Sequence, residues 1–289
     1  MNSFVIFTDS ACDIDIGTLE KWGIKSLPLS FRFIDEDEAY YDNEIPMKEF
    51  YDKIREGRVA KTAGVNPEEF ESAFEKELKQ GKDILYIGFS SGLSTTFNSA
   101  NIAKKKLSLI YPERKILTVD SLCASAGLGL LLYLASKEAD IGATVDEVAA
   151  FATSTRHSLC HFFTVEDLMY LMRGGRVSKA KAFFGNMLGI KPILHVDNTG
   201  YLVNISKIRG RRLALTMLAD MYVRSRKNKT DADNVFISHS DCMEDAEFLA
   251  SMIKERTGTQ VSLITSVGSV IGAHSGPGTL ALFFLGDKR

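Results

Sequence analysis

The chain has 289 residues, 45% of them hydrophobic, with 35 Lys and Arg against 37 Asp and Glu. This length and composition exclude a disordered chain and a small disulfide scaffold, and they predict about two globular domains. A net charge of −2 argues against a dedicated nucleic-acid-binding protein, because such proteins carry a basic excess that displaces counterions from phosphates. Four widely spaced cysteines without a Cys-x-x-Cys pair predict buried thiols in a reducing compartment. No basic region precedes the first apolar run, so we expect a cytoplasmic protein without a signal peptide.

The first half of the chain alternates short apolar runs with amphipathic segments. Residues 4–8, 83–90 and 115–120 are rich in Ile, Val and Phe, which predicts three buried strands. Asn66 stands before a proline and two glutamates, and Thr144 stands shortly before a glutamate, so both residues are predicted to begin helices. Strands that alternate with helices predict a largely parallel sheet with helices on its faces.

The second half has a different pattern, which begins near His157. Residues 191–206 are predicted to form two strands around an Asp-Asn-Thr-Gly turn, and such a hairpin indicates antiparallel pairing. Further helices are predicted at 211–223 and 241–256, and further strands at 234–238, 261–266 and 279–286. The predicted fold class is therefore α/β with two domains. Residues 1–156 would form a mostly parallel sheet with flanking helices, and residues 157–289 a domain with a mixed or antiparallel sheet.

A loop rich in glycine and hydroxyl side chains, residues 88–99, follows the predicted strand 83–90. A strand end followed by such a loop and a helix start suits anion binding, because free amides and the positive end of the helix dipole point outward. We therefore expect a ligand site here, with Ser91, Ser94 and Thr95 among its hydroxyls. The alternative is that Ser94 or Thr95 only caps the following helix.

The same loop matches the serine-hydrolase pattern Gly-x-Ser-x-Gly, with Ser90 in the nucleophile position. His274 would then be the general base, and Asp120 or Asp241 would orient it. No His-Gly oxyanion motif precedes the serine, because the first histidine in the chain is His157. A serine hydrolase is therefore kept as the alternative function.

His274 stands in a segment, residues 268–279, that combines glycines and hydroxyls in one predicted bend, where glycine would allow close backbone approach. Two segments, 173–181 and 207–212, concentrate basic residues, and these are predicted as solvated surface or as patches that steer a protein partner. The sequence contains no Walker motif, no His-Glu-x-x-His and no metal-spaced carboxylate cluster. We therefore expect no metal site, no cofactor and no ATP site in this chain.

An ordered set of motifs, taken together, resembles the DegV family of bacterial fatty-acid-binding proteins, which includes the FakB subunits of fatty acid kinase. The motifs are residues 8–13, 90–94, 119–121, 173–176, 189–193 and 271–278. The resemblance implies a two-domain α/β protein that encloses a long-chain fatty acid between its domains. It also implies that the carboxylate is presented to a separate ATP-dependent kinase for acyl-phosphate formation. Such a protein is a lipid-binding component and not an enzyme by itself, with no nucleic-acid partner and only transient membrane contact.

The family's site residues carry over to individual positions of this chain. The resemblance implies that Thr62 and Ser94 bind the carboxylate, that His274 lies beside it, and that Arg209 docks the kinase. Two departures concern these positions: Ala-Gly-Val follows Thr62 in place of Ser-Gln-Pro, and Thr95 replaces the loop glycine. Large apolar side chains of the second half are expected either to line the acyl tunnel or to pack in the core. They are Phe162, Phe163, Phe183, Phe184 and Met187.

Overall fold

The structure is a computed structural model that describes residues 4–177, 189–227, 234–287 and 289. Its first sheet has four parallel strands in the order β2-β1-β6-β7. These strands are β1 (Phe4–Asp9), β2 (Ile24–Leu27), β6 (Asp83–Gly88) and β7 (Ile116–Asp120). The predicted parallel sheet is confirmed. Its central strands β1 and β6 are apolar and buried almost throughout, as a sheet that is covered on both faces requires.

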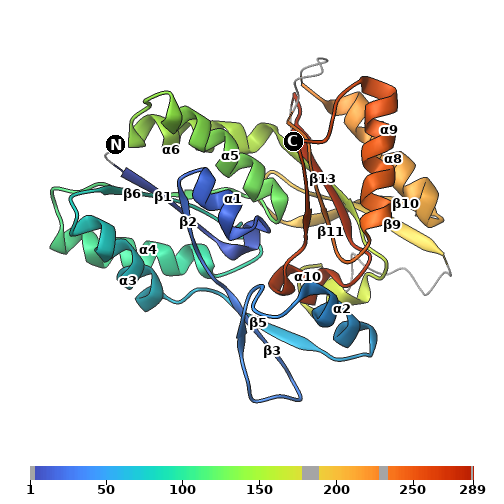
Figure 1. Cartoon of the computed structure of the whole chain (residues 1–289), viewed down its shortest axis with the longest axis horizontal. Helices are drawn as coiled ribbons and strands as arrows, with labels where there is room; N and C mark the ends of the chain where they lie inside the picture. Colours follow the sequence, from blue (N-terminus) through green and yellow to red (C-terminus); the bar gives the residue numbers. More distant parts are fainter. Residues whose placement is uncertain (1–3, 178–188, 228–233, 288) are drawn as a thin grey trace.

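Helices cover both faces of this sheet. In Figure 1, α3 (Pro67–Leu78) and α4 (Thr96–Ile110) lie on one side, and α5 (Ala126–Asp140) and α6 (Val145–Thr155) lie on the other. The short helix α1 (Ile16–Lys21) contacts β2. The predicted helix starts are confirmed by two capping boxes. The side chain of Asn66 accepts a hydrogen bond from the Glu69 amide at 2.9 Å, and Thr144 caps α6 in the same way, so amides without helical partners are satisfied.

The second sheet has six strands in the order β10-β9-β8-β13-β11-β12. All neighbours are antiparallel except β11 and β12, which confirms the predicted mixed sheet. Two helices, α8 (Arg211–Ser225) and α9 (Met243–Thr257), pack together beside it (Figure 1). The strands are β8 (Leu159–Thr164), β9 (Ile190–Val196), β10 (Leu202–Arg209), β11 (Phe236–His239), β12 (Leu263–Ser266) and β13 (Leu280–Leu285).

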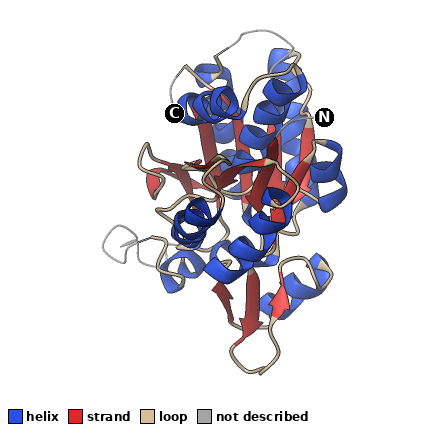
Figure 2. Ribbon diagram, turned by 90° about the vertical axis from the view of Figure 1, so that its left-hand side faces the viewer, coloured by secondary structure: helices blue, strands red, loops and turns tan. Residues whose placement is uncertain are grey.

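A third, small antiparallel sheet was not predicted. It consists of β3 (Ser30–Phe33), β4 (Tyr40–Tyr41) and β5 (Ala60–Ala63), and α2 (Met47–Arg55) connects β4 to β5. Figure 2 shows this sheet projecting below the two larger ones. Buried aromatic side chains, among them Phe31, Phe50 and Tyr51, hold the sheet and helix together. The unit contacts α10 (Ser269–Ser275) near the other end of the chain.

Helix α10 occupies most of the segment that the sequence predicted as a glycine bend, and its one glycine, Gly272, serves helix packing. A Cβ at Gly272 would lie 2.5 Å from the Tyr51 hydroxyl of α2, so only glycine lets the two helices approach this closely. The same hydroxyl donates to the Val267 carbonyl at 2.8 Å, just before α10 begins. The predicted close backbone approach is therefore present at Gly272, where helix α2 is the partner. The remaining short helices are η1 (Ser10–Cys12), η2 (Arg156–Ser158) and α7 (Met169–Arg173).

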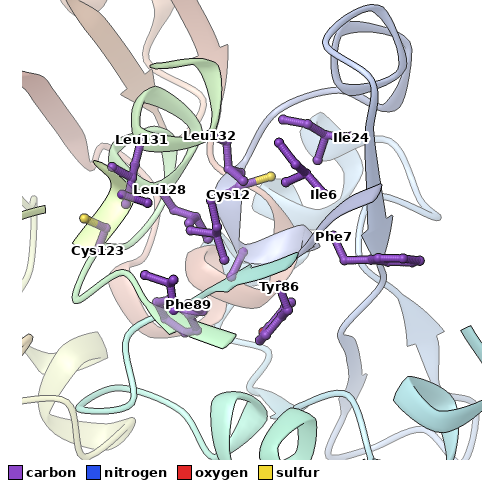
Figure 3. Close-up of a cluster of buried hydrophobic side chains, with 14 of the residues drawn as sticks. Ile6, Phe7, Cys12, Ile24, Tyr86, Phe89, Cys123, Leu128, Leu131 and Leu132 are labelled. Carbon is purple, nitrogen blue, oxygen red and sulfur yellow. The ribbon is translucent and has the colours of Figure 1, made fainter. Parts of the chain in front are cut away.

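The largest hydrophobic core extends from the first sheet to the second. Figure 3 shows part of it, where Ile6 and Leu132 lie with the buried thiol of Cys12. Helix α5 also contacts β8, β11 and β13 of the second sheet. Because α5 comes before residue 156 and packs against strands that come after it, the predicted domain division at 156 stays a prediction. Cys12, Cys123 and Cys160 are buried, as expected, whereas Cys242 is only partly buried.

No helix in the described part of the chain combines the length and the apolar character needed to span a bilayer.

Candidate functional site

A cavity of about 470 Å³ is lined by strand residues of the second and third sheets, by the loop that follows β6 of the first sheet, and by α10. Its volume lies within the range of about 300–1,000 Å³ that is usual for small-molecule sites. Much of the wall is apolar, with large side chains contributed by β8, β9, β10 and β13; examples are Phe163, Val196, Leu202 and Phe283. Hydroxyl, imidazole and guanidinium groups form the rest, and most of the predicted site residues are among them.

Thr62 and His274 meet in this cavity although 212 positions separate them. Thr62 lies on β5, and His274 lies on α10, which packs against that strand. The Thr62 Oγ1 and His274 Nε2 atoms are 2.8 Å apart. If Nε2 donates, the Thr62 hydroxyl keeps its proton for another acceptor; if Nε2 accepts, Nδ1 carries the ring proton. In the first case the Thr62 hydroxyl can donate to a ligand oxygen. In the second case the ring proton is on Nδ1, which is buried and faces Gly174.

The imidazole of His274 is neutral at neutral pH. Burial, with a smaller contribution from the Arg176 charge, lowers the pKa of His274 to about 4. Its Nδ1 atom is buried and has no hydrogen-bond partner among the described residues. A Cβ at Gly174 would lie 2.2 Å from this atom. Since Gly174 has an ordinary helical φ of −70°, the space next to His274, and not the backbone conformation, requires glycine there.

Ser94 lies on the same side of the cavity as Thr62. Its Oγ accepts from the Thr96 amide at 3.2 Å and lies 2.9 Å from the Thr96 hydroxyl. A Cβ at Gly64, just after Thr62, would lie 3.5 Å from Ser94 Oγ and 2.4 Å from Thr96 Oγ1. The Thr62 strand and the Ser94 loop are therefore in contact, and the hydroxyls of Thr62 and Ser94 lie in the same wall of the cavity. Their roles toward a ligand stay a prediction.

Ser91 and Thr95 also line the cavity, at solvent-exposed positions of the loop. The Ser91 amide donates to Asp120 at 3.2 Å, which ties the loop to the end of β7. Thr95 is the N-cap residue of α4, but its side chain makes no capping hydrogen bond. The capping alternative therefore does not account for Thr95. For Ser94 the capping bond is present, through the Thr96 amide.

Arg176 is a half-buried cavity residue, whereas its basic segment was predicted as solvated surface or as a patch that steers a protein partner. Its Nε donates to the Leu93 carbonyl at 3.1 Å and its Nη1 to the Gly174 carbonyl at 2.5 Å, so two backbone segments fix the guanidinium. Burial lowers the pKa of Arg176, yet a guanidinium keeps its charge at neutral pH. An anion in the cavity would therefore meet one fixed positive charge and several neutral hydrogen-bond donors. The sequence signal for this residue was the Arg-Gly-Gly-Arg motif within the family resemblance.

Ser90 has a structural position that does not support a hydrolase. Its hydroxyl is buried, donates to the Gly200 carbonyl at 2.9 Å and accepts from the Gly92 amide at 3.2 Å. The expected partners are engaged elsewhere, because His274 contacts Thr62 and Asp241 pairs with Arg55 at 2.6 Å. Ser90 therefore holds the β9–β10 turn against the hydroxyl loop.

Arg209 lies apart from the cavity wall. It is exposed at the end of β10, whereas Leu202 at the start of β10 lines the cavity. The two residues are about 23 Å apart along the strand at about 3.3 Å per residue. Its expected role in docking a kinase stays a prediction.

Of the expected tunnel residues, Phe163 lines the cavity, and Phe162 packs on the other face of the sheet against Phe284 and His195. Successive strand residues point to opposite faces, so the two neighbours cannot both reach the cavity. Phe183, Phe184 and Met187 lie outside the described residues. Within the described ranges, no group of three or more His, Cys, Asp or Glu side chains is placed to hold a metal ion.

Fold and cavity together define an α/β protein with a cavity of small-molecule size, one wall of which is polar and carries a positive charge. The family model described as uncharacterised protein, DegV family, matches residues 3–287, and the chain belongs to this family. A DegV domain-containing protein of Clostridium perfringens is 44% identical over 292 residues, which cover 100% of this chain and 99% of that protein. The predicted family resemblance is therefore confirmed.

Solved structures share the fold over the whole chain. A DegV lipid-binding protein from Thermotoga maritima has a TM-score of 0.85 and 29% identity, with 100% of both chains covered. A DegV family protein from Thermus thermophilus, described for its fatty acid binding, has a TM-score of 0.87 and 26% identity, with 99% of this chain and 100% of that chain covered. The predicted α/β fold class is thus confirmed.

Proposed function

We propose that this chain binds one long-chain fatty acid in the cavity, with its carboxylate at the wall formed by Thr62, Ser94, His274 and Arg176. The proposal is carried by a fixed cation among neutral hydroxyl and imidazole groups, in a cavity much of whose remaining wall is apolar. A fatty acid has the matching chemistry, because one end is an anion and the remainder is apolar. The lipid and fatty acid binding described for the two structural relatives supports the same ligand class.

The apolar walls supply most of the binding free energy in this proposal. Each buried methylene contributes about 0.8 kcal/mol, and a chain of about fifteen methylenes gives on the order of 12 kcal/mol before ordering costs. The polar wall mainly fixes the orientation of the carboxylate. Arg176 offsets the desolvation of that anion, because an unpaired charge is costly to bury.

The orientation of the carboxylate suits phosphoryl transfer to one of its oxygens. A carboxylate is anionic at neutral pH, so its attack on a γ-phosphate depends on positioning and charge neutralisation more than on a general base. In the proposal a separate ATP-dependent kinase supplies the nucleotide and forms the acyl phosphate. This chain is then the lipid-binding component, works in the cytoplasm and contacts the membrane transiently to acquire its ligand.

Titration calorimetry with octadecanoate and octadecanol tests the binding proposal. The acid should bind wild-type protein more tightly than the alcohol, because only the acid carries a charge for Arg176. Arg176→Ala should weaken the acid about tenfold or more and leave the alcohol unchanged. Arg173→Ala is the matched control, since Arg173 is exposed and lies over the Tyr170 ring. Equal affinity of both ligands in wild type and variant would contradict the assignment of the polar wall.

The docking role of Arg209 is tested separately with a purified bacterial fatty acid kinase and ATP. Arg209→Ala should keep octadecanoate affinity, because Arg209 lies far along β10 from the cavity, and should lower acyl-phosphate formation roughly tenfold. Arg224→Ala removes an exposed charge from α8 and serves as the control. Loss of octadecanoate affinity in Arg209→Ala would contradict the separation of binding from docking.

A further inference from the structure

A second polar region lies in the cavity wall formed by β8, β11 and the start of α5. His161 on β8 and Ser238 on β11 line the cavity together with Ser125, which precedes α5. Their apolar neighbours on the same sheet face are Phe163 and Phe283. These polar residues belong to other elements than the Thr62, Ser94 and His274 wall, so they are not needed to hold a carboxylate there.

The Nε2 atom of His161 is a hydrogen-bond acceptor without a partner. Nδ1 lies 3.1 Å from the Leu159 carbonyl, and because a carbonyl only accepts, Nδ1 must carry the ring proton. Burial lowers the pKa of His161 well below its ordinary value, so the ring is neutral and Nε2 keeps a free lone pair. This atom is buried and has no hydrogen-bond partner among the described residues. A Cβ at Gly127 would lie 2.2 Å from Nε2, so glycine at the start of α5 is required for this ring orientation.

The neighbouring hydroxyls are those of Ser125 and Ser238, and an unusual backbone conformation at Ser125 fixes the first of them. Ser125 has φ 54° and ψ −147°, a region that side chains other than glycine rarely adopt. In this conformation its hydroxyl donates to the buried carboxylate of Asp13 and lies 2.8 Å from the Ser238 hydroxyl. The wall therefore presents a fixed pair of hydroxyls as well as the unpaired imidazole nitrogen. The two hydroxyls already have hydrogen-bond partners, so a purely apolar acyl chain leaves only the imidazole nitrogen of this wall unsatisfied.

We propose that this wall recognises a hydroxyl group on the acyl chain, so that the preferred ligands are hydroxylated long-chain fatty acids. The inference rests on the proposed function and names its substrate class. The ligand hydroxyl donates to His161 Nε2, and the Ser125 and Ser238 hydroxyls keep this part of the wall polar. A keto oxygen at the same carbon cannot replace the hydroxyl, because it accepts hydrogen bonds and donates none.

The test measures the affinity of wild-type protein for octadecanoate, for a positional series of monohydroxyoctadecanoates and for the matching oxo acids. One hydroxy isomer should bind about tenfold more tightly than octadecanoate, since it satisfies a buried acceptor that is otherwise unpaired. The matching oxo acid should show no gain. His161→Phe should abolish the gain, so that this variant binds the hydroxy acid and octadecanoate equally. Phe162→Leu, on the opposite face of the same strand, should keep the gain.

Nitrogen-15 NMR of labelled histidine keeps the test independent of the folding of these variants. In wild-type protein the preferred hydroxy acid should shift the Nε2 resonance of His161 in the direction of a hydrogen-bonded acceptor, and octadecanoate should not. If octadecanoate itself fails to bind, the proposed function is wrong. If octadecanoate binds but no hydroxy isomer exceeds it, or the oxo acids gain equally, only the hydroxyl subsite is wrong.

Discussion

Gly174→Ala is predicted to weaken fatty acid binding by moving His274. The added Cβ would lie 2.2 Å from His274 Nδ1, about 1.2 Å short of ordinary contact at 3.4 Å. If the ring moves away by this amount, its 2.8 Å hydrogen bond to Thr62 is lost. Because φ at Gly174 is −70°, alanine causes no backbone strain and the effect is confined to this contact. The displaced pair no longer positions its donor for the ligand carboxylate. Loss of such a hydrogen bond to a charged group costs about 1.5–3 kcal/mol, which corresponds to a roughly 10- to 100-fold weaker affinity.

Titration calorimetry with octadecanoate at neutral pH measures this effect, and thermal unfolding checks that the variant is folded. Gly17→Ala is the matched control, since its Cβ would meet Asp15 at an ordinary 3.4 Å. The control should bind like wild type. A folded Gly174→Ala protein with an affinity within twofold of wild type would refute the placement of His274 beside the carboxylate.

Three further predictions concern charge and stability. His274 should titrate near pH 4 by NMR without ligand, and bound octadecanoate should raise its pKa. The low pKa also makes stability depend on pH, because the unfolded chain takes up a proton near pH 6.5 and the folded chain does not. The free energy of unfolding should therefore fall by about 3 kcal/mol as the pH decreases from 6.5 towards 4. A histidine with an ordinary pKa would contradict its burial. Ser90→Ala should lower the free energy of unfolding by about 1–3 kcal/mol, because the Gly200 carbonyl loses its buried donor, and wild-type Ser90 should resist fluorophosphonate labelling. Labelling at Ser90 would restore the hydrolase alternative. Asn66→Ala should cost about 1 kcal/mol of unfolding free energy and leave octadecanoate affinity unchanged, since the cap of α3 lies outside the polar wall; calorimetric melting together with titration checks both parts.

Local sequence signals predicted the elements that depend on local physics. Asn66 and Thr144 begin helices in the structure because a capping box satisfies amides within one turn. The buried strands β1 and β6 were predicted from apolar runs. The third sheet was missed because its strands are short and mix charged with apolar residues, as in the Ser-Phe-Arg-Phe sequence of β3. Its stability comes from aromatic packing with α2, which the sequence alone does not display.

The site was predicted less completely, because tertiary contacts decide the role of several residues. The glycines of residues 268–279 predicted a close approach without its partner, and at Gly272 that partner is the Tyr51 hydroxyl. Arg176 was interpreted as surface charge, but the carbonyls of Leu93 and Gly174 fix it inside the cavity. His161 carried no signal at all, since an isolated histidine in an apolar strand is typical of a core residue. The absence of a partner for its Nε2 atom follows from tertiary structure, namely the pairing of β8 with β13 and the packing of α5 against them.

Native mass spectrometry of the purified protein, followed by extraction of any bound molecule, determines whether the cavity holds a fatty acid. We predict one fatty acid per chain, which added octadecanoate displaces one for one. A protein that carries no fatty acid after purification and also fails to bind added octadecanoate would contradict the assignment of the cavity.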